Sequence, residues 1–75
     1  MSLTIEMVAE IIEQEGAWSA AVKRAVAKRL GISNTQASKH LTALVEAKYL
    51  YRVAFGPNMY YAVDPTLTLE QIVGS

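Results

Sequence analysis

The sequence predicts a mainly α-helical domain with a small β-hairpin near its C-terminal end. Two observations lead to this prediction. Apolar residues recur at helical spacing in three segments between residues 3 and 47. Two short runs rich in aromatic and β-branched residues follow, one on each side of a Gly-Pro-Asn turn. Because the chain has only 75 residues, we expect a single domain over residues 1–75.

The stretch 22–47 is typical of two helices separated by a tight turn. Gly31 follows Leu30 directly, which suits the left-handed residue that ends many helices. Ser33 is a natural N-cap, and Gln36 three positions later completes a capping box. A helix, a short turn that contains glycine and a capped second helix together predict a helix-turn-helix.

The flanking segments are assigned from their caps and turns. Ser2 or Thr4 can cap a first helix that ends at Gly16, and Thr66 or Thr68 can cap a short last helix. The expected order is a helix up to about residue 14, helices over 20–30 and 34–47, a hairpin over 49–63 and a helix over 69–73. Candidates for the inward face of the hairpin are Leu50, Val53, Tyr61 and Val63, with the strand register left open.

Trp18 is the only tryptophan, and we expect it to fill the core beneath the helices. Its indole N–H would then reach a backbone carbonyl, as buried tryptophans usually do. Stacking against a ligand is the weaker alternative. The segment 17–19 is too short for an independent strand, so it would form a single bridge or an extended connection.

Charge is segregated along the chain although the net charge is zero. All seven Lys and Arg lie between residues 23 and 52 with a single acid, Glu46, so this segment carries +6 and the flanks carry −6. Such a dipole can bind a polyanion with one face, although a run of charge can also be only a solvated surface. The expected phosphate contacts are Lys23, Arg24, Lys28, Arg29, Lys48 and Arg52.

The third predicted helix has an outer face suited to reading DNA bases. Its inner face is apolar, and nearly every outward side chain can donate or accept a hydrogen bond without being acidic. This is the chemistry that recognition of base edges in the major groove requires. The expected base contacts are Asn34, Thr35, Gln36, Ser38, Lys39, His40 and Thr42.

The first helix is expected to contribute to a homodimer. Its apolar residues cover most of its circumference, whereas a helix packed on one side of a domain needs a narrower stripe. Enclosure by neighbouring elements of the same chain is the alternative explanation. The expected interface is Ile5, Val8 and Ile12 together with Leu69, Ile72 and Val73.

Catalysis, cofactors and metal binding are not expected. The chain has no cysteine, which excludes a thiolate site, and its single histidine does not provide a protein-only zinc site. His40 has no Ser, Asp or Glu partner at a catalytic spacing, and no Gly-rich phosphate loop is present. No apolar run approaches the roughly 20 residues of a membrane span, and the N-terminus lacks a signal-peptide pattern. We therefore expect a cytoplasmic protein without a membrane partner.

Three helices followed by a hairpin, with a helix-turn-helix inside, form the winged-helix arrangement. Over residues 30–63 the sequence resembles the ArsR/MarR-like transcription regulators of bacteria and archaea, through the segments LGIS, QASKHLTALVEAKYL and YYAV. The resemblance implies a winged helix-turn-helix domain that binds DNA as a homodimer, with the hairpin wing on the backbone or minor groove. The resemblance does not extend to metal sensing, because the cysteine and histidine clusters are missing. The wing tip 55–58 has no Lys or Arg, so strong insertion of the wing into a minor groove is not expected.

Taken together, these features predict a small transcriptional regulator that binds double-stranded DNA sequence-specifically. Two chains would present their third helices about one turn of DNA apart, roughly 34 Å. The alternatives are a winged-helix module that binds protein, and a replication or architectural accessory factor without sequence-specific regulation. The basic, hydrogen-bonding third helix favours DNA.

Overall fold

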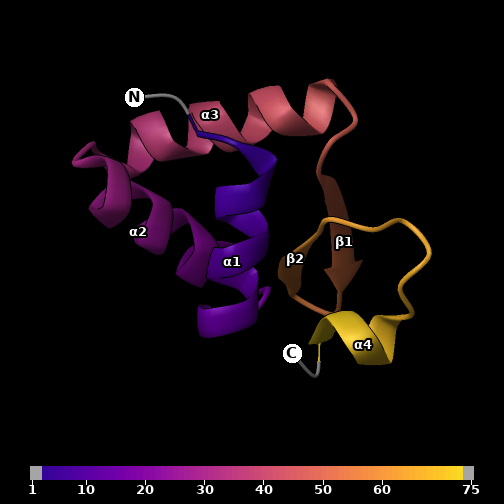
Figure 1. Cartoon of the computed structure of the whole chain (residues 1–75). Helices are drawn as coiled ribbons and strands as arrows, with labels where there is room; N and C mark the ends of the chain where they lie inside the picture. Colours follow the sequence, from indigo (N-terminus) through magenta and orange to yellow (C-terminus); the bar gives the residue numbers. More distant parts are fainter. Residues whose placement is uncertain (1–2, 74–75) are drawn as a thin grey trace.

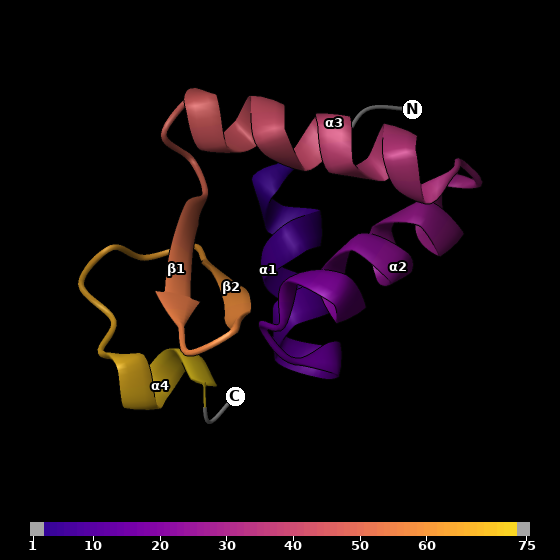
Figure 2. The same ribbon diagram turned by 180° about the vertical axis from the view of Figure 1, so that it is seen from behind.

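Three helices, a two-stranded antiparallel hairpin and a short fourth helix follow one another along the chain (Figure 1). The computed structural model describes residues 3–73. In both views α3 lies along one end of the molecule, while α4 and the hairpin turn lie at the opposite end (Figure 2). The elements are α1 (Ile5–Glu15), α2 (Ser19–Leu30), α3 (Asn34–Glu46), β1 (Tyr51–Phe55), β2 (Asn58–Ala62) and α4 (Leu69–Val73).

The ends of α1, α2 and α3 are set by residues that cap the helix or turn the chain. The Thr4 hydroxyl accepts the Met7 N–H at 3.3 Å and caps α1, whereas Ser2 lies outside the described residues. Gly31 adopts φ 67° and ψ 37° after α2, the left-handed conformation in which a Cβ is unfavourable. Ser33 Oγ accepts the Gln36 N–H at 3.1 Å, and Gln36 Oε1 accepts the Ser33 N–H at 3.2 Å. The predicted capping box of α3 is confirmed.

The C-terminal end of α3 uses a lysine where helices usually use glycine. Lys48 has φ 69°, a left-handed conformation that costs an L-residue about 1 kcal/mol. Its N–H donates to the Val45 carbonyl at 3.1 Å, and the Tyr49 N–H donates to the Leu44 carbonyl at 3.0 Å. These two bonds form a Schellman motif, which satisfies the last carbonyls of the helix and turns the chain toward β1.

The hairpin separates two apolar clusters. Its register pairs Arg52 with Tyr61 and Val53 with Tyr60, so these two pairs lie on opposite faces. Tyr61 is buried against the helices. Tyr60 and Val53 pack instead on a small cluster that includes Ile72 of α4. The main core contains Leu3, Val8, Ile11, Val22, Val26, Ala27, Ala37, Leu41, Leu50 and Tyr61.

The connection to α4 is organised by side chains that accept backbone hydrogen bonds. Asp64 Oδ1 accepts the Thr66 N–H at 2.9 Å and the Thr66 hydroxyl at 2.7 Å, and these two bonds lower the pKa of Asp64. Thr68 forms a second capping box, because its hydroxyl accepts the Gln71 N–H while Gln71 Oε1 accepts the Thr68 N–H. Of the two threonines predicted as the cap, Thr68 is the one that caps α4.

Trp18 does not fill the core, so this prediction is wrong. The Tyr61 N–H donates to the Ala17 carbonyl at 2.8 Å, and Trp18 forms an isolated bridge with Tyr60. Side chains alternate along an extended segment, so Ala17 points inward and is buried while Trp18 points outward. The Trp18 side chain is 46% exposed. The expected single bridge at 17–19 is confirmed.

The structure also corrects two residues of the expected dimer interface. Val8 is completely buried and Ile72 is 4% exposed, each inside the core of one chain. Ile5 and Ile12 are half-buried and pack against the same cores. Neighbouring elements of the same chain therefore account for much of the broad apolar surface of α1, and Val8 and Ile72 have almost no surface left for a partner.

Replacing Lys48 with glycine should stabilise the protein. Lys48→Gly removes the unfavourable Cβ contact of the left-handed conformation, so we expect the free energy of unfolding to rise by about 1 kcal/mol in urea denaturation. Ala47→Gly is the matched control. Ala47 has a right-handed φ of −78°, so glycine there should lower stability by roughly 0.5–1 kcal/mol. Equal losses of stability in both variants would contradict the assignment of Lys48 as an unfavourable left-handed residue.

Candidate nucleic-acid interface

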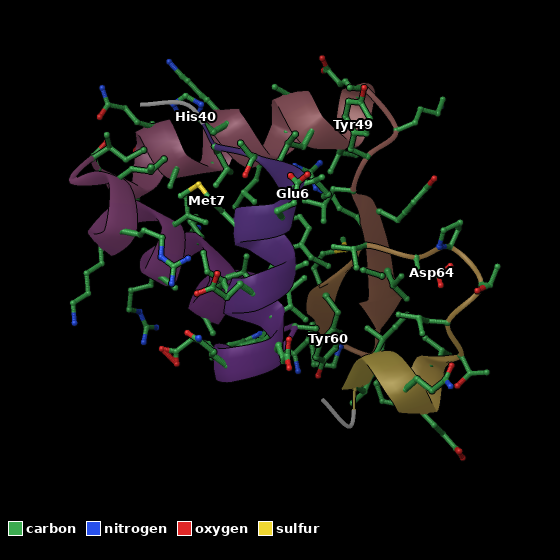
Figure 3. All side chains as sticks on the ribbon, in the orientation of Figure 1. Glu6, Met7, His40, Tyr49, Tyr60 and Asp64 are labelled. Carbon is green, nitrogen blue, oxygen red and sulfur yellow. The ribbon has the colours of Figure 1, made fainter. Side chains whose placement is uncertain are left out.

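The two faces of α3 differ sharply in chemistry. Ala37 and Leu41 are completely buried on its inner face. Figure 3 shows Met7 of α1 on the inner side of α3 and His40 at the outer end of the molecule, away from α4. The predicted base contacts Asn34, Thr35, Gln36, Lys39 and His40 are exposed, and Ser38 and Thr42 are half-buried. No acid lies on α3 before Glu46 at its end, so most of this face can approach a polyanion without repulsion.

The capping box restricts what Gln36 can offer to a ligand. Its Oε1 accepts the Ser33 N–H, which holds the side-chain amide at the N-terminal end of α3. The amide nitrogen keeps two N–H donors. Gln36 can therefore donate to a base acceptor such as purine N7 or thymine O4, while the same side chain stabilises the helix.

Arg52 links the hairpin to α3. Its Nη2 donates to Thr42 Oγ1 at 2.7 Å, and its guanidinium carbon lies 6.0 Å from the centre of the Tyr61 ring. Thr42 and Arg52 were expected as separate contacts to base and phosphate, but the structure joins them. A guanidinium has five N–H donors, so Arg52 can hold Thr42 and still offer donors to a phosphate. No local sequence pattern points to this contact, because its partners come from different elements.

Three of the four cations of α2 line grooves that also contain residues of α1. Arg29 Nη2 lies 3.2 Å from Glu10 Oε1 of α1, an ion pair that partly neutralises it. Lys28 and Arg29 line a shallow open groove with residues of α1, and Arg24 lines an adjoining one. None of the residues that line these two grooves belongs to α3. Arg24, Lys28 and Arg29 therefore lie on a side of α2 that faces α1, whereas Lys39 lies on α3 and Lys48 and Arg52 follow it in the chain.

Within residues 3–73, no three His, Asp or Glu side chains come together in a way that could hold a metal ion. In the same range, no helix is long and apolar enough to cross a membrane. The polar side chains of α3 form the candidate site. Their arrangement offers hydrogen-bond donors and acceptors on one exposed helix, beside isolated positive charges.

The Thr42–Arg52 contact should be measurable as a coupling energy. In a double-mutant cycle with Thr42→Val and Arg52→Met, we expect about 0.5–1 kcal/mol of interaction in urea denaturation, typical of one hydrogen bond. Thr42→Val combined with Arg24→Met is the control and should be additive, because Arg24 is on α2 and lines the groove beside α1. An additive result for Thr42 and Arg52 would show that the contact contributes nothing in solution.

Comparisons with known proteins do not add to this picture. No protein-family model matches the sequence, and neither the curated proteins nor the solved structures yield a significant match. The function is therefore inferred from the residues of α3, their geometry and their charges.

Proposed function

We propose that the protein binds double-stranded DNA sequence-specifically and acts as a small homodimeric transcriptional regulator of the winged helix-turn-helix type. In this proposal α2 and α3 are the helix-turn-helix, and α3 enters the major groove. The observation that supports it most is the outer face of α3, where Asn34, Thr35, Gln36, Lys39 and His40 are exposed and no acid lies among them.

The position of α3 suits entry into a groove. A major groove about 12 Å wide admits one α-helix. Because α3 lies along one end of the molecule, neither α4 nor the hairpin turn stands in front of it (Figures 1 and 2). Asn34, Gln36 and Ser38 are the proposed base readers. Lys39 is proposed as the phosphate contact on the same helix.

The hairpin is proposed to play a smaller part than the wing of a typical winged helix. Its turn lies beside α4 at the end remote from α3, and Phe55 and Leu69 line a common apolar groove there. Arg52, at the α3 end of β1, is the hairpin residue best placed to meet a phosphate, since it contacts Thr42 of α3. Recognition is therefore assigned mainly to α3.

A second candidate function is a protein-interaction module, or an accessory factor that binds DNA without regulating specific sites. The exposed apolar side chains of Trp18, Phe55 and Leu69 favour a protein contact somewhere on the chain. They lie at the α4 end, however, and α3 exposes no large apolar side chain. DNA remains the proposed ligand of α3, in the cytoplasm and without a cofactor.

Substitutions on α3 should separate affinity from specificity in mobility-shift titrations. Lys39→Ala should weaken binding to all duplexes alike and reduce the slope of log affinity against log salt by about one. Ser38→Ala should instead lower the preference for the selected sequence, by roughly 1 kcal/mol at one base pair. Glu13→Gln, an exposed position near the C-terminal end of α1, is the control and should leave sequence preference unchanged.

Selection of bound sequences from a random duplex pool supplies the sequence for these titrations. A regulator should enrich a defined motif, whereas an accessory factor should enrich none. Absence of binding to any duplex at low salt would overturn the proposed function, because electrostatic attraction to phosphates is then strongest.

A further inference from the structure

An open pocket beside the C-terminal end of α1 combines aromatic rings with a carboxylate. We refer to it as the Trp18 pocket, and its volume is about 290 Å³. Figure 3 shows one of its residues, Tyr60, between α1 and α4. The lining residues come from the end of α1, the connection to α2, β2 and α4, namely Glu15, Gly16, Ala17, Trp18, Asn58, Tyr60 and Val73.

Two aromatic side chains lie next to each other in the Trp18 pocket. Trp18 and Tyr60 form an antiparallel bridge, and side chains of a bridged pair lie on the same side with their Cβ atoms roughly 5 Å apart. Tyr60 is half-buried and packs on the cluster that contains Ile72, whereas Trp18 is 46% exposed. Packing therefore restrains the tyrosine, while much of the indole is accessible to a ligand.

The charged residue that lines the Trp18 pocket is Glu15. Among residues 3–73, no Lys or Arg lines it. Glu15 also lines the two grooves between α1 and α2 that contain Lys28, yet the ion pair of the described chain joins Arg29 to Glu10 instead. The Glu15 carboxylate makes no ion pair or hydrogen bond with any residue that the structure describes. It can therefore accept hydrogen bonds from a cationic ligand.

The end of α1 adds to the negative character of this pocket. A helix C-terminus carries about half a negative elementary charge, which basic residues in the last turn usually offset. The last turn of α1 contains Glu13 and Glu15 and no basic residue. The faces of aromatic rings are negative as well. The carboxylate, the helix end and the two rings thus all favour a positively charged ligand.

We propose that the Trp18 pocket binds a guanidinium group, either of an arginine side chain on a polypeptide or of free arginine. A guanidinium is planar, so it can stack on the exposed indole and donate two parallel N–H bonds to one carboxylate. An ammonium ion is compact and strongly hydrated, and it lacks both of these contacts. The proposal does not involve α3 and does not depend on DNA binding.

Other classes of ligand fit the Trp18 pocket less well. Nucleic acid bases can stack on tryptophan, but the phosphates that accompany them would be repelled by Glu15. A purely apolar ligand would cover the carboxylate without giving it a partner, and a buried charge without a partner is costly. A cation with a flat face avoids both penalties.

The openness of the pocket predicts weak binding of a single guanidinium group. An exposed ion pair and an exposed cation–π contact each contribute little, because water screens both of them. A small arginine derivative should therefore bind in the millimolar range, and more weakly as salt rises.

Titration followed by ¹H–¹⁵N NMR spectra tests the site. Trp18 is the only tryptophan, so its indole N–H gives a single, recognisable signal. N-acetyl-arginine amide should shift this signal and the amides of Gly16 and Tyr60, and leave those of Lys39 and His40 on α3 in place. N-acetyl-citrulline amide has nearly the same shape without the charge, and it should bind roughly fivefold more weakly or less.

Two variants with the same change of charge test the role of the carboxylate. Glu15→Gln should weaken binding about threefold to fivefold, the most that one exposed ion pair contributes. Glu13→Gln is the matched control, because Glu13 is exposed in the same turn of α1 but does not line the Trp18 pocket, and it should bind like the wild type. Equal weakening in both variants would overturn the proposal, since it would show only a general attraction to acids.

Trp18→Leu tests the stacking contact. It should weaken binding about threefold to fivefold, measured through the amide signals of Gly16 and Tyr60. Unchanged signals elsewhere in the spectrum verify that the variant is folded. Wild-type affinity in this variant would overturn the assignment of Trp18 as the stacking residue.

Further ligands distinguish the cation and its source. N-acetyl-lysine amide should bind more weakly than the arginine derivative, and equal binding would overturn the choice of guanidinium. Tighter binding of N-acetyl-arginine amide than of free arginine identifies a side chain on a polypeptide as the ligand, and the reverse order identifies the free amino acid. Absence of any shift at Trp18 with both would overturn the proposal. No DNA is present in these titrations, so their result and that of the DNA titrations are independent.

Discussion

The close packing of α2 against α3 determines which side chains the chain displays. Ala27 and Ala37 are both buried in the main core, and small residues at these positions allow the two helices to approach closely. Gly31 and the capping box between them set where α3 begins. Since each residue of a helix is rotated by about 100° from the last, a shift of one position would bury polar side chains of α3 and expose Leu41. The outer face of α3 is polar because the capping box and the packing against α2 fix the rotation of α3 about its own axis.

That constraint also shapes the electrostatics of the molecule. The positive charges are close together in sequence but do not all share one surface, because α2 packs against both α1 and α3. One side of α2 therefore meets the acids of α1, as the Arg29–Glu10 pair shows. The attraction of the protein for a polyanion should then depend on a few charges near α3 rather than on the full +6 of the segment. Net charge along a sequence is a poor guide to the charge of one surface.

Features set by local chemistry could be predicted from the sequence, and those set by distant contacts could not. The caps at Thr4 and Ser33 and the turn at Gly31 depend on residues within four positions of each other. The outward turn of Trp18 depends on its bridge to Tyr60, which no nearby residue signals. The Thr42–Arg52 bond likewise needs the hairpin register and the end of α3 to be known together. The exposed polar residues of α3 follow from helical spacing, so they could be predicted. The burial of Val8 depends on contacts with distant elements of the same chain, so it could not.

The backbone bond between Ala17 and Tyr61 has a consequence for how the chain folds. Contacts among α1, α2 and α3 join neighbours in sequence and close small loops, so their entropic cost is low. The Ala17–Tyr61 bond joins the start of α2 to a strand near the other end of the chain. It requires β2 to reach the segment before α2, more than 40 residues away in the sequence, and it brings Ala17 to the apolar cluster beneath α4. We infer that the three helices organise first and that the hairpin and α4 dock last. The end of the molecule near α4, where Trp18 is exposed, is then the last to acquire its structure.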